Sequence, residues 1–363
     1  MPAYLYSIIF LYSVIILTVV SLTTVPKSYG AIKRGVNDFM PALLICAVYA
    51  LWIGNRPLSG RYFGDTSNYA WTFNLMKDGL NIPSMDGEWL WNKLMYTCSQ
   101  SLDVSEFFTL VDICYFGFTL WACRRLTPNN VLVSLLFCLG AFSFFSYGTN
   151  GIRNGLACSL ILLYLSYLTG TKKDKLIAAA IAFFAFNIHH STVLPILMSV
   201  ISLFFIRSFK VAYTFWILSI LVSLLAGGAV TSFFASLGFD ERVSYLQTTM
   251  DSDTFSHTGF RWDFLIYSMM PIILGYYIIY KRRIRNGIYE VLLNTYTLSN
   301  AFWVMVIRAN YSNRFAYLSW FMYPIVLAYP LLKVDVWGDL QGNRLKKIML
   351  AQVGFTWFMY TIY

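Results

Sequence analysis

The chain has 363 residues, of which 58% are hydrophobic and only 12% are charged, and its mean hydropathy is +0.59. A soluble domain carries about 25% charged residues, so this composition excludes an ordinary soluble enzyme and predicts an integral membrane protein. The net charge of +10 comes mainly from short loops between apolar runs. It is therefore a signal of membrane topology and does not indicate a nucleic-acid partner.

Apolar runs follow one another along the sequence, although several are shorter than the roughly 20 residues that span a bilayer as a helix. They predict an all-α polytopic membrane protein with about 12 transmembrane helices, forming a single transmembrane domain over residues 1–363. The predicted spans are Ala3–Val25, Phe39–Ile53, Ser105–Cys123, Val131–Ser146, Leu156–Leu168, Leu176–Ile188, Thr192–Ile206, Val211–Val230, Phe264–Tyr280, Val291–Ile307, Phe315–Leu332 and Ile348–Ile362.

Lysine and arginine cluster in every second loop, and such a bias is typical of cytoplasmic loops. The clusters are Lys27–Arg34, Arg124–Arg125, Lys172–Lys175, Arg207–Lys210, Lys281–Arg285 and Lys333–Lys347. With these loops inside, both termini are expected to face the outside. Residues 176–206 could form either one long helix or a short hairpin; the positive clusters at both ends favour a hairpin with His189 and His190 at its outer tip.

Two long connections, residues 54–104 and 231–263, are expected on the outer side and to form part of an outward-facing active-site region. The basic residues of this side are mostly arginine, which pairs with phosphate in a bidentate geometry; they are Arg56, Arg61, Lys77, Lys93, Arg153, Arg242, Arg261, Arg308 and Arg314. Any single one of them could instead snorkel or form an ion pair, Arg261 with Asp263 for example. As a set, the arginines at predicted helix mouths indicate an anion-binding cavity.

Arg153 is the most informative member of this set, because it lies in the glycine-rich segment 147–155 between two apolar runs. Ionisable groups at membrane depth are costly and tend to line substrate or ion paths, and glycines let a backbone approach a ligand closely. The remaining charges of the first outer connection are interpreted as solvated loop charges; they are Lys77, Asp78, Asp86, Glu88 and Lys93.

Signatures of soluble enzymes are absent: the sequence has no phosphate-binding P-loop, no dinucleotide fingerprint, no HExxH and no GxSxG. The histidines and acids have no spacing typical of a metal site. His189, His190 and Asp65 could each act as a general base, a choice that geometry must decide.

Four segments, in order, resemble the EpsG-type branch of the Wzy-like bacterial polysaccharide polymerases. They are Arg56 with Gly64–Tyr69, then Asn150–Ala157, then Ile188–Thr192, and finally Asn313–Leu318. They are similar to that family's Arg…Gly-x-Asp-Thr-x-x-Tyr, Asn-x-x-Arg-Gln-x-Leu-Ala, His-x-Ser and Arg-x-x-x-Tyr patterns. The chain departs at Asn154, where the family has glutamine, and the histidine position is shared between His189 and His190.

The resemblance implies a metal- and cofactor-independent glycosyltransferase of the GT-C type in the bacterial inner membrane. It would join oligosaccharide repeat units carried on undecaprenyl diphosphate at the outer leaflet. Its partners would be this lipid-linked oligosaccharide, membrane lipid, a chain-length regulator and a flippase. The diphosphate would be bound by Arg153, Arg314 and Arg56, then Arg308 and Arg261, with Asn150, Tyr69 and Tyr317 near the substrate. His189 would be the general base, with His190 and Asp65 as alternates. Fixed cations are the chemistry that a departing diphosphate requires.

Two other functions remain open at this point. An O-antigen ligase-like transferase would use the same donor but usually carries a larger late outer loop than residues 231–263 provide. A flippase or transporter for lipid-linked oligosaccharides would need cationic residues along both halves of its pathway, and internal repeats are common in transporters; here the candidate residues gather on one side and no repeat is visible. The sugars, their linkage and the type of polysaccharide are not encoded in recognisable motifs.

Overall fold

A computed structural model describes residues 1–35, 37–81, 87–236, 259–308 and 313–362, and within these ranges the chain is helical and contains no strand. The all-α prediction is confirmed for this part of the protein. Internal contacts divide the chain into unit 1, made of residues 1–192 and 328–363, and unit 2, made of residues 193–327. Each unit is described by itself.

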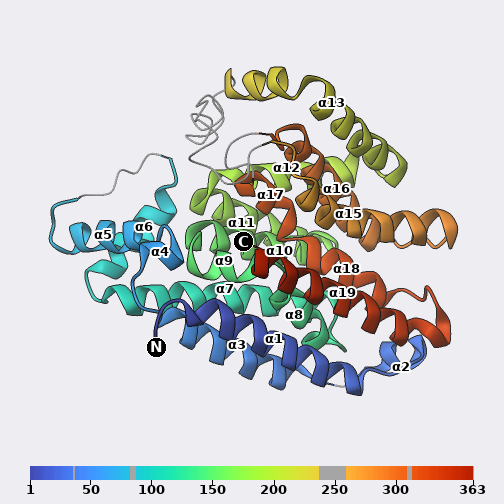
Figure 1. Ribbon diagram of the computed structural model, residues 1–363, viewed down its shortest axis with the longest axis horizontal. Coiled ribbons are helices and arrows are strands. Elements are labelled where there is room, and N and C mark those ends of the chain that lie inside the picture. The colour runs from blue at the N-terminus through green and yellow to red at the C-terminus, as the bar shows by residue number, and fades with distance from the viewer. Residues whose placement is uncertain (36, 82–86, 237–258, 309–312, 363) are drawn as a thin grey trace. The chain divides into compact units, whose positions relative to one another are not determined.

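In unit 1, α3 and α10 both pack along the long helix α7 (Figure 1). Connection 54–104 contains three helices, α4, α5 and α6. The helices of this unit are α1 (Leu5–Thr24), α2 (Tyr29–Arg34), α3 (Phe39–Gly54), α4 (Gly60–Phe63), α5 (Thr66–Lys77), α6 (Trp89–Ser99), α7 (Val104–Leu126), α8 (Val131–Leu139), α9 (Phe144–Thr149), α10 (Ile152–Leu168), α11 (Lys172–Ile188), η1 (His190–Thr192), η3 (Gly338–Leu340) and α19 (Gln341–Ile362).

Local sequence explains where the main helices of unit 1 begin. Asp103 and Glu106 form a capping box at the start of α7, and Thr171 and Asp174 form a second one at the start of α11. In each box the two side chains satisfy backbone N–H groups that have no partner inside the helix. The last turn of α7 carries Arg124 and Arg125, which the negative end of the helix dipole favours.

The apolar run 131–146, expected as one span, is broken after α8 at Gly140. A Cβ at Gly140 would lie 2.8 Å from a methyl group of Val353 on α19, so that helix approaches the break closely. Gln352 and Thr356 of α19 donate hydrogen bonds of 2.7 Å to the carbonyls of Phe137 and Gly140. These bonds satisfy carbonyls that the end of α8 leaves open, which explains why the helix can end in an apolar environment.

Helices α10 and α11 pack against each other and are joined by the short connection 169–171. Both have 17 residues, about 25 Å at 1.5 Å per residue. Because consecutive helices of equal length with a short connection run antiparallel, the beginning of α10 meets the end of α11. The helix of residues 176–206 is interrupted as expected: α11 ends at Ile188, His189 has extended backbone, and α12 begins at Val193.

Unit 2 is built around α16, which contacts α12, α13, α15 and α17. Asn300 of α16 accepts a hydrogen bond from Trp216 and donates one to Ser319, the kind of side-chain bond that joins helices in apolar surroundings. Helix α18 (Tyr323–Lys333) begins in this unit and ends in unit 1. The other helices are α12 (Val193–Phe204), α13 (Phe209–Ser236), which is kinked at Ala226, α15 (Trp262–Tyr276), the π-helical turn η2 (Tyr277–Lys281), α16 (Gly287–Met305) and α17 (Asn313–Trp320).

Five helical segments among the described residues are long and apolar enough to cross a membrane. They are Leu5–Thr24, Val104–Leu126, Phe209–Val230, Trp262–Lys281 and Phe315–Lys333, with shorter apolar helices at Phe39–Gly54, Ile152–Leu168 and His190–Phe204. The chain is therefore a multi-pass helical membrane protein. The full set of twelve spans and the outward termini stay predictions.

Candidate functional site

Three segments of unit 1 meet at the end of the α10–α11 hairpin. Arg153 lies in the first turn of α10, His189 directly follows α11, and Glu88 directly precedes α6. Glu88 uses both of its carboxylate oxygens here: Oε2 forms an ion pair with Nη1 of Arg153, and Oε1 contacts Nδ1 of His189. The backbone N–H of His190 also donates to Oε1, at 3.0 Å. One carboxylate therefore joins two of the segments singled out by sequence.

Exposure differs sharply within this Glu88 cluster, formed by Glu88, Arg153 and His189. The side chain of Arg153 is 30% exposed, that of Glu88 16% and that of His189 only 2%. His190 is half-buried, and its ring stacks on Phe186 with the ring centres 4.6 Å apart. Arg153 and His190 are thus the members of the region that a ligand outside the protein can reach.

The electrostatics of the cluster depend on Glu88. Its burial alone would raise its pKa, but the hydrogen bond and charge of His189, the charge of Arg153 and the His190 N–H lower the pKa to about 2. Glu88 is therefore ionised at neutral pH and can only accept hydrogen bonds. Since an ionised carboxylate has no proton to share, Nδ1 of His189 must be the donor in their contact.

Helix ends set the charge preference of each position. His189 follows the C-terminal end of α11, where the helix dipole favours a cation, whereas Arg153 lies at the N-terminal end of α10, where the dipole disfavours one by about 0.3–1 kcal/mol. Glu88 offsets that cost by placing a negative charge beside Arg153. The open N–H groups of a helix N-terminus also favour anions, so the beginning of α10 favours a negative charge, which Glu88 supplies beside Arg153.

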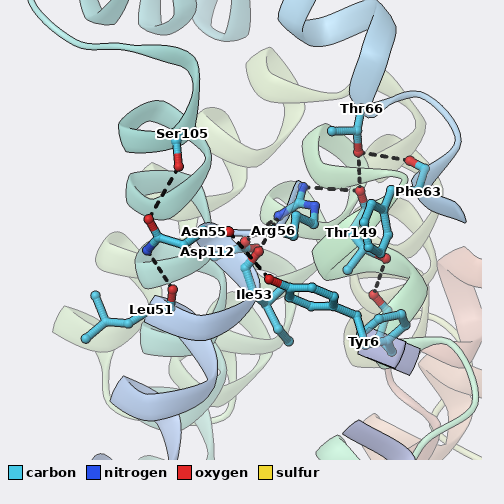
Figure 2. Close-up of polar contacts among 11 residues, drawn as sticks. Tyr6, Leu51, Ile53, Asn55, Arg56, Phe63, Thr66, Ser105, Asp112 and Thr149 are labelled. Atoms are coloured by element: carbon cyan, nitrogen blue, oxygen red, sulfur yellow. Dashed lines mark hydrogen bonds and ion pairs between the residues drawn. The ribbon is translucent and has the colours of Figure 1, made fainter. Parts of the chain in front are cut away.

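A second ion pair joins Arg56 to Asp112, and Figure 2 shows its contacts. Nη1 of Arg56 is 2.9 Å from Oδ2 of Asp112, and the side chains are 0% and 1% exposed. Nη2 of Arg56 donates to the carbonyl of Thr149 at 3.2 Å, and Thr66 Oγ1 donates to the same carbonyl at 2.6 Å. The sequence interpretation placed Arg56 against the diphosphate, and that role stays a prediction. In this structure the guanidinium is buried and binds three parts of the chain together.

Asn150 makes a further link between the first two sequence segments. Its Oδ1 accepts the backbone N–H of Asp65 at 2.9 Å. Gly64 precedes this contact with a positive φ of +50°, and a Cβ there would lie 2.3 Å from Oδ1 of Asn150. Glycine is therefore required both by the backbone conformation and by the close approach. Asn150 orders the connection between α9 and α10, and Asp65 is half-buried at the start of α5.

Aromatic side chains belong to the same connection, residues 54–104. Tyr69 is half-buried and its ring meets that of Trp91 edge-on, with the centres 5.6 Å apart. The indole N–H of Trp89 donates to Oδ1 of Asn187 in the last turn of α11. This bond attaches the beginning of α6 to the end of α11 beside Glu88.

The remaining predicted residues belong to unit 2. Arg261 pairs with Asp263 through two hydrogen bonds of 3.0 and 2.7 Å, which confirms the expected ion pair, and it stacks over Phe264. Arg308 is exposed and lies over the ring of Phe260 at 5.9 Å. Tyr317 is half-buried on α17, next to Trp320. The side chain of Arg314 lies outside the described residues, as do Arg242 and most of the predicted outer connection 231–263.

Two acidic residues of the site were not recognised from sequence. Glu88 was expected to be a solvated loop charge, and this is wrong: its side chain is 16% exposed and paired on both sides. Asp112 lies in the apolar helix α7 and is the partner of Arg56. An acid inside an otherwise apolar span was the available signal for Asp112. Glu88 had no such signal, because it stands among other loop charges.

Within the described residues, no group of three or more His, Cys, Asp or Glu side chains is arranged to hold a metal ion. The site is instead a cationic side chain and two histidines gathered around one carboxylate, at the end of a helix hairpin. The fold and this arrangement together describe a multi-pass membrane protein with a partly exposed guanidinium held by a carboxylate at a helix end.

A sequence model of the EpsG family matches residues 39–363, nearly the whole chain. The protein therefore belongs to the EpsG family, as the ordered segments suggested, and this membership points to a polysaccharide polymerase of the EpsG/Wzy type. No curated protein and no solved structure matches the chain.

Proposed function

We propose that the protein is a glycosyltransferase of the GT-C type that polymerises oligosaccharide repeat units carried on undecaprenyl diphosphate. The reaction would take place at the outer face of the bacterial inner membrane and build an O-antigen, capsule or exopolysaccharide. The observation that carries the proposal is the Glu88 cluster: Arg153 is held by a carboxylate at a helix N-terminus, yet 30% of its side chain is exposed.

In this reaction an acceptor hydroxyl attacks the anomeric carbon of the donor sugar. The bond between that carbon and the diphosphate oxygen breaks, and the diphosphate leaves on its lipid. Negative charge develops on the departing oxygen, and a preorganised guanidinium stabilises such charge more effectively than water. Arg153 is assigned this role, while Arg308, Arg261 and Arg314 of unit 2 are further candidates for the diphosphates of donor and acceptor.

The proton of the acceptor hydroxyl needs a base, and the candidates are His189, His190 and Asp65. A base must come within hydrogen-bond reach of the proton that it removes. His190 and Asp65 are half-buried, whereas His189 is 2% exposed. The exposure favours His190 or Asp65 as the group that meets the substrate.

The proposal is tested by Arg153→Ala in cells that lack the native gene. The expected result is normal amounts of protein in the membrane but loss of the polysaccharide ladder on gels, leaving products with at most one repeat unit. Arg125→Ala is a matched control, because Arg125 is 28% exposed and also pairs with a carboxylate, Asp174, at 2.8 Å. Full-length ladders from the Arg153 variant would refute the assignment.

The same strains separate the rival activities. Loss of a ligase would leave polymer that is made but not transferred to its final acceptor. Loss of a flippase would leave single lipid-linked repeat units on the cytoplasmic leaflet. Single units that reach the outer leaflet and remain unpolymerised are the result expected of a polymerase variant.

A further inference from the structure

The Glu88 cluster fixes the side chain of Arg153 more firmly than anion binding by an arginine requires. What this implies rests on the proposed role of Arg153. A single salt bridge leaves a long side chain free to rotate about the bond that it makes, and holding such a side chain costs about 2 kcal/mol of rotamer entropy. Here the carboxylate partner of Arg153 is itself held from behind, by the ring of His189 and the N–H of His190.

His189 is buried and fixed through both its side chain and its backbone. Its side chain is 2% exposed, its backbone is extended at the end of α11, and its carbonyl accepts a hydrogen bond from the hydroxyl of Thr192 at 2.8 Å. Next to it, the bond between Trp89 and Asn187 fixes the beginning of α6 to the last turn of α11. The atom of His189 that faces the site, Nδ1, is committed to Glu88.

We propose that His189 and Glu88 are positioning residues for Arg153, and that His189 acts as a hydrogen-bond donor and not as the catalytic base. The ring holds one oxygen of Glu88, which leaves the other oxygen aimed at the guanidinium. Arg153 is thereby kept in one orientation before substrate arrives. Preorganisation of this kind lowers the cost of binding and aligns the cation with the departing diphosphate.

The assignment explains why two adjacent histidines occur at this position. His189 is buried and holds Glu88 through its ring, while His190 touches Glu88 only through its backbone N–H and keeps its half-buried ring on Phe186. The two rings therefore have different tasks. The inward ring supports Arg153, and the outward ring is the one available for proton transfer.

Substitution of His189 by asparagine separates positioning from base catalysis. The amide nitrogen of asparagine occupies nearly the place of Nδ1 and can donate to Glu88, but it cannot accept a proton at neutral pH. Polymerisation by H189N is expected to stay within about tenfold of wild type, while H189A, which has no donor, loses about a hundredfold, the size of effect that a small misplacement of a catalytic group produces. The measurement is turnover of purified protein on a lipid-diphosphate-linked oligosaccharide, with KM and kcat determined separately.

Glu88 supplies the second test. E88D is one methylene shorter and cannot reach both Arg153 and His189, so its kcat should fall although its charge is unchanged. H189N that is folded and as inactive as H189A would overturn the proposal, as would H189A or E88D with wild-type turnover. If neither histidine variant accumulates in the membrane, E88D decides alone. Failure of the proposed function is distinguishable from these outcomes, since it would show as normal polymerisation by Arg153→Ala.

Discussion

Removal of Asp112 should destabilise the protein far more than removal of an exposed charge. Asp112→Ala leaves the guanidinium of Arg56 buried at 0% exposure, without its carboxylate partner at 2.9 Å. The backbone carbonyls of Ile53 and Thr149 and the rings of Phe63 and Phe108 would remain around it. These groups are dipolar or aromatic, so none of them replaces a full negative charge.

The expected magnitude follows from the burial of the pair. Two unit charges about 4 Å apart interact by about 4 kcal/mol at an effective dielectric constant of 20, and breaking a buried pair by removing one partner typically costs about 3–5 kcal/mol. At roughly 1.3 °C per kcal/mol for a chain of this size, the thermal midpoint should fall by about 4–7 °C. The double variant Arg56→Met with Asp112→Leu should recover most of this loss, because it leaves no uncompensated charge.

The assay is thermal unfolding of the purified protein in detergent micelles, followed by tryptophan fluorescence. Arg285→Ala is the control, since Arg285 also pairs with a carboxylate, Glu290, but its side chain is 62% exposed; exposed pairs contribute about 0–1 kcal/mol. Two results would refute the reasoning. One is Asp112→Ala as stable as the control, and the other is a double variant no more stable than the single one.

Three further predictions concern the ends of the helices. The pKa of Glu88 is lowered from 4.5 to about 2, so its stabilising effect is complete above about pH 4.5 and is lost as pH falls towards 2. The difference in thermal midpoint between wild type and Glu88→Gln should therefore narrow over this pH range. A difference that stays constant would contradict the assignment. Gly64→Ala should lower the free energy of unfolding by at least about 1–2 kcal/mol from its left-handed backbone alone. Adding Asn150→Gly should recover only the part due to the clash between the new Cβ and the Asn150 side chain. A Gly64→Ala variant as stable as wild type would contradict this. Single cysteines placed in an otherwise cysteine-free protein at positions 153, 190 and 314 should react with an impermeant reagent from outside, and one at position 283 should not. The reverse pattern would overturn the topology.

Much of the candidate site was predictable because helix ends carry strong local signals. The glycine-rich segment before Arg153 and the pair His189–His190 both interrupt apolar runs, so each had to lie at the end of a helix. The lengths of α10 and α11 then bring the two ends together. The pairing of Arg261 with Asp263 was equally accessible, because the two residues are close in the sequence and flank the beginning of α15.

The roles of Arg56 and Glu88 were not predictable in the same way. Arg56 and Asp112 are 56 residues apart, and nothing local to either one specifies that they meet. Glu88 looks like Asp78 in the sequence, but Asp78 is exposed, whereas the contact of α6 with α11 partly buries Glu88. Both cases concern charged residues, whose exposure depends on which helices pack over them.

The sequence alone established that this is a helical multi-pass membrane protein of the EpsG family. The signals were composition, apolar periodicity and ordered motifs, which depend on the residues of each segment and not on what that segment packs against. The packing of α6, α7, α10 and α11 decided which charges serve the site. It buried Arg56 against Asp112, left Arg153 partly exposed, and placed Glu88 between Arg153 and His189. The reason is physical: the cost of a charge depends on its distance from water and from opposite charge, and both distances exist only in the folded protein.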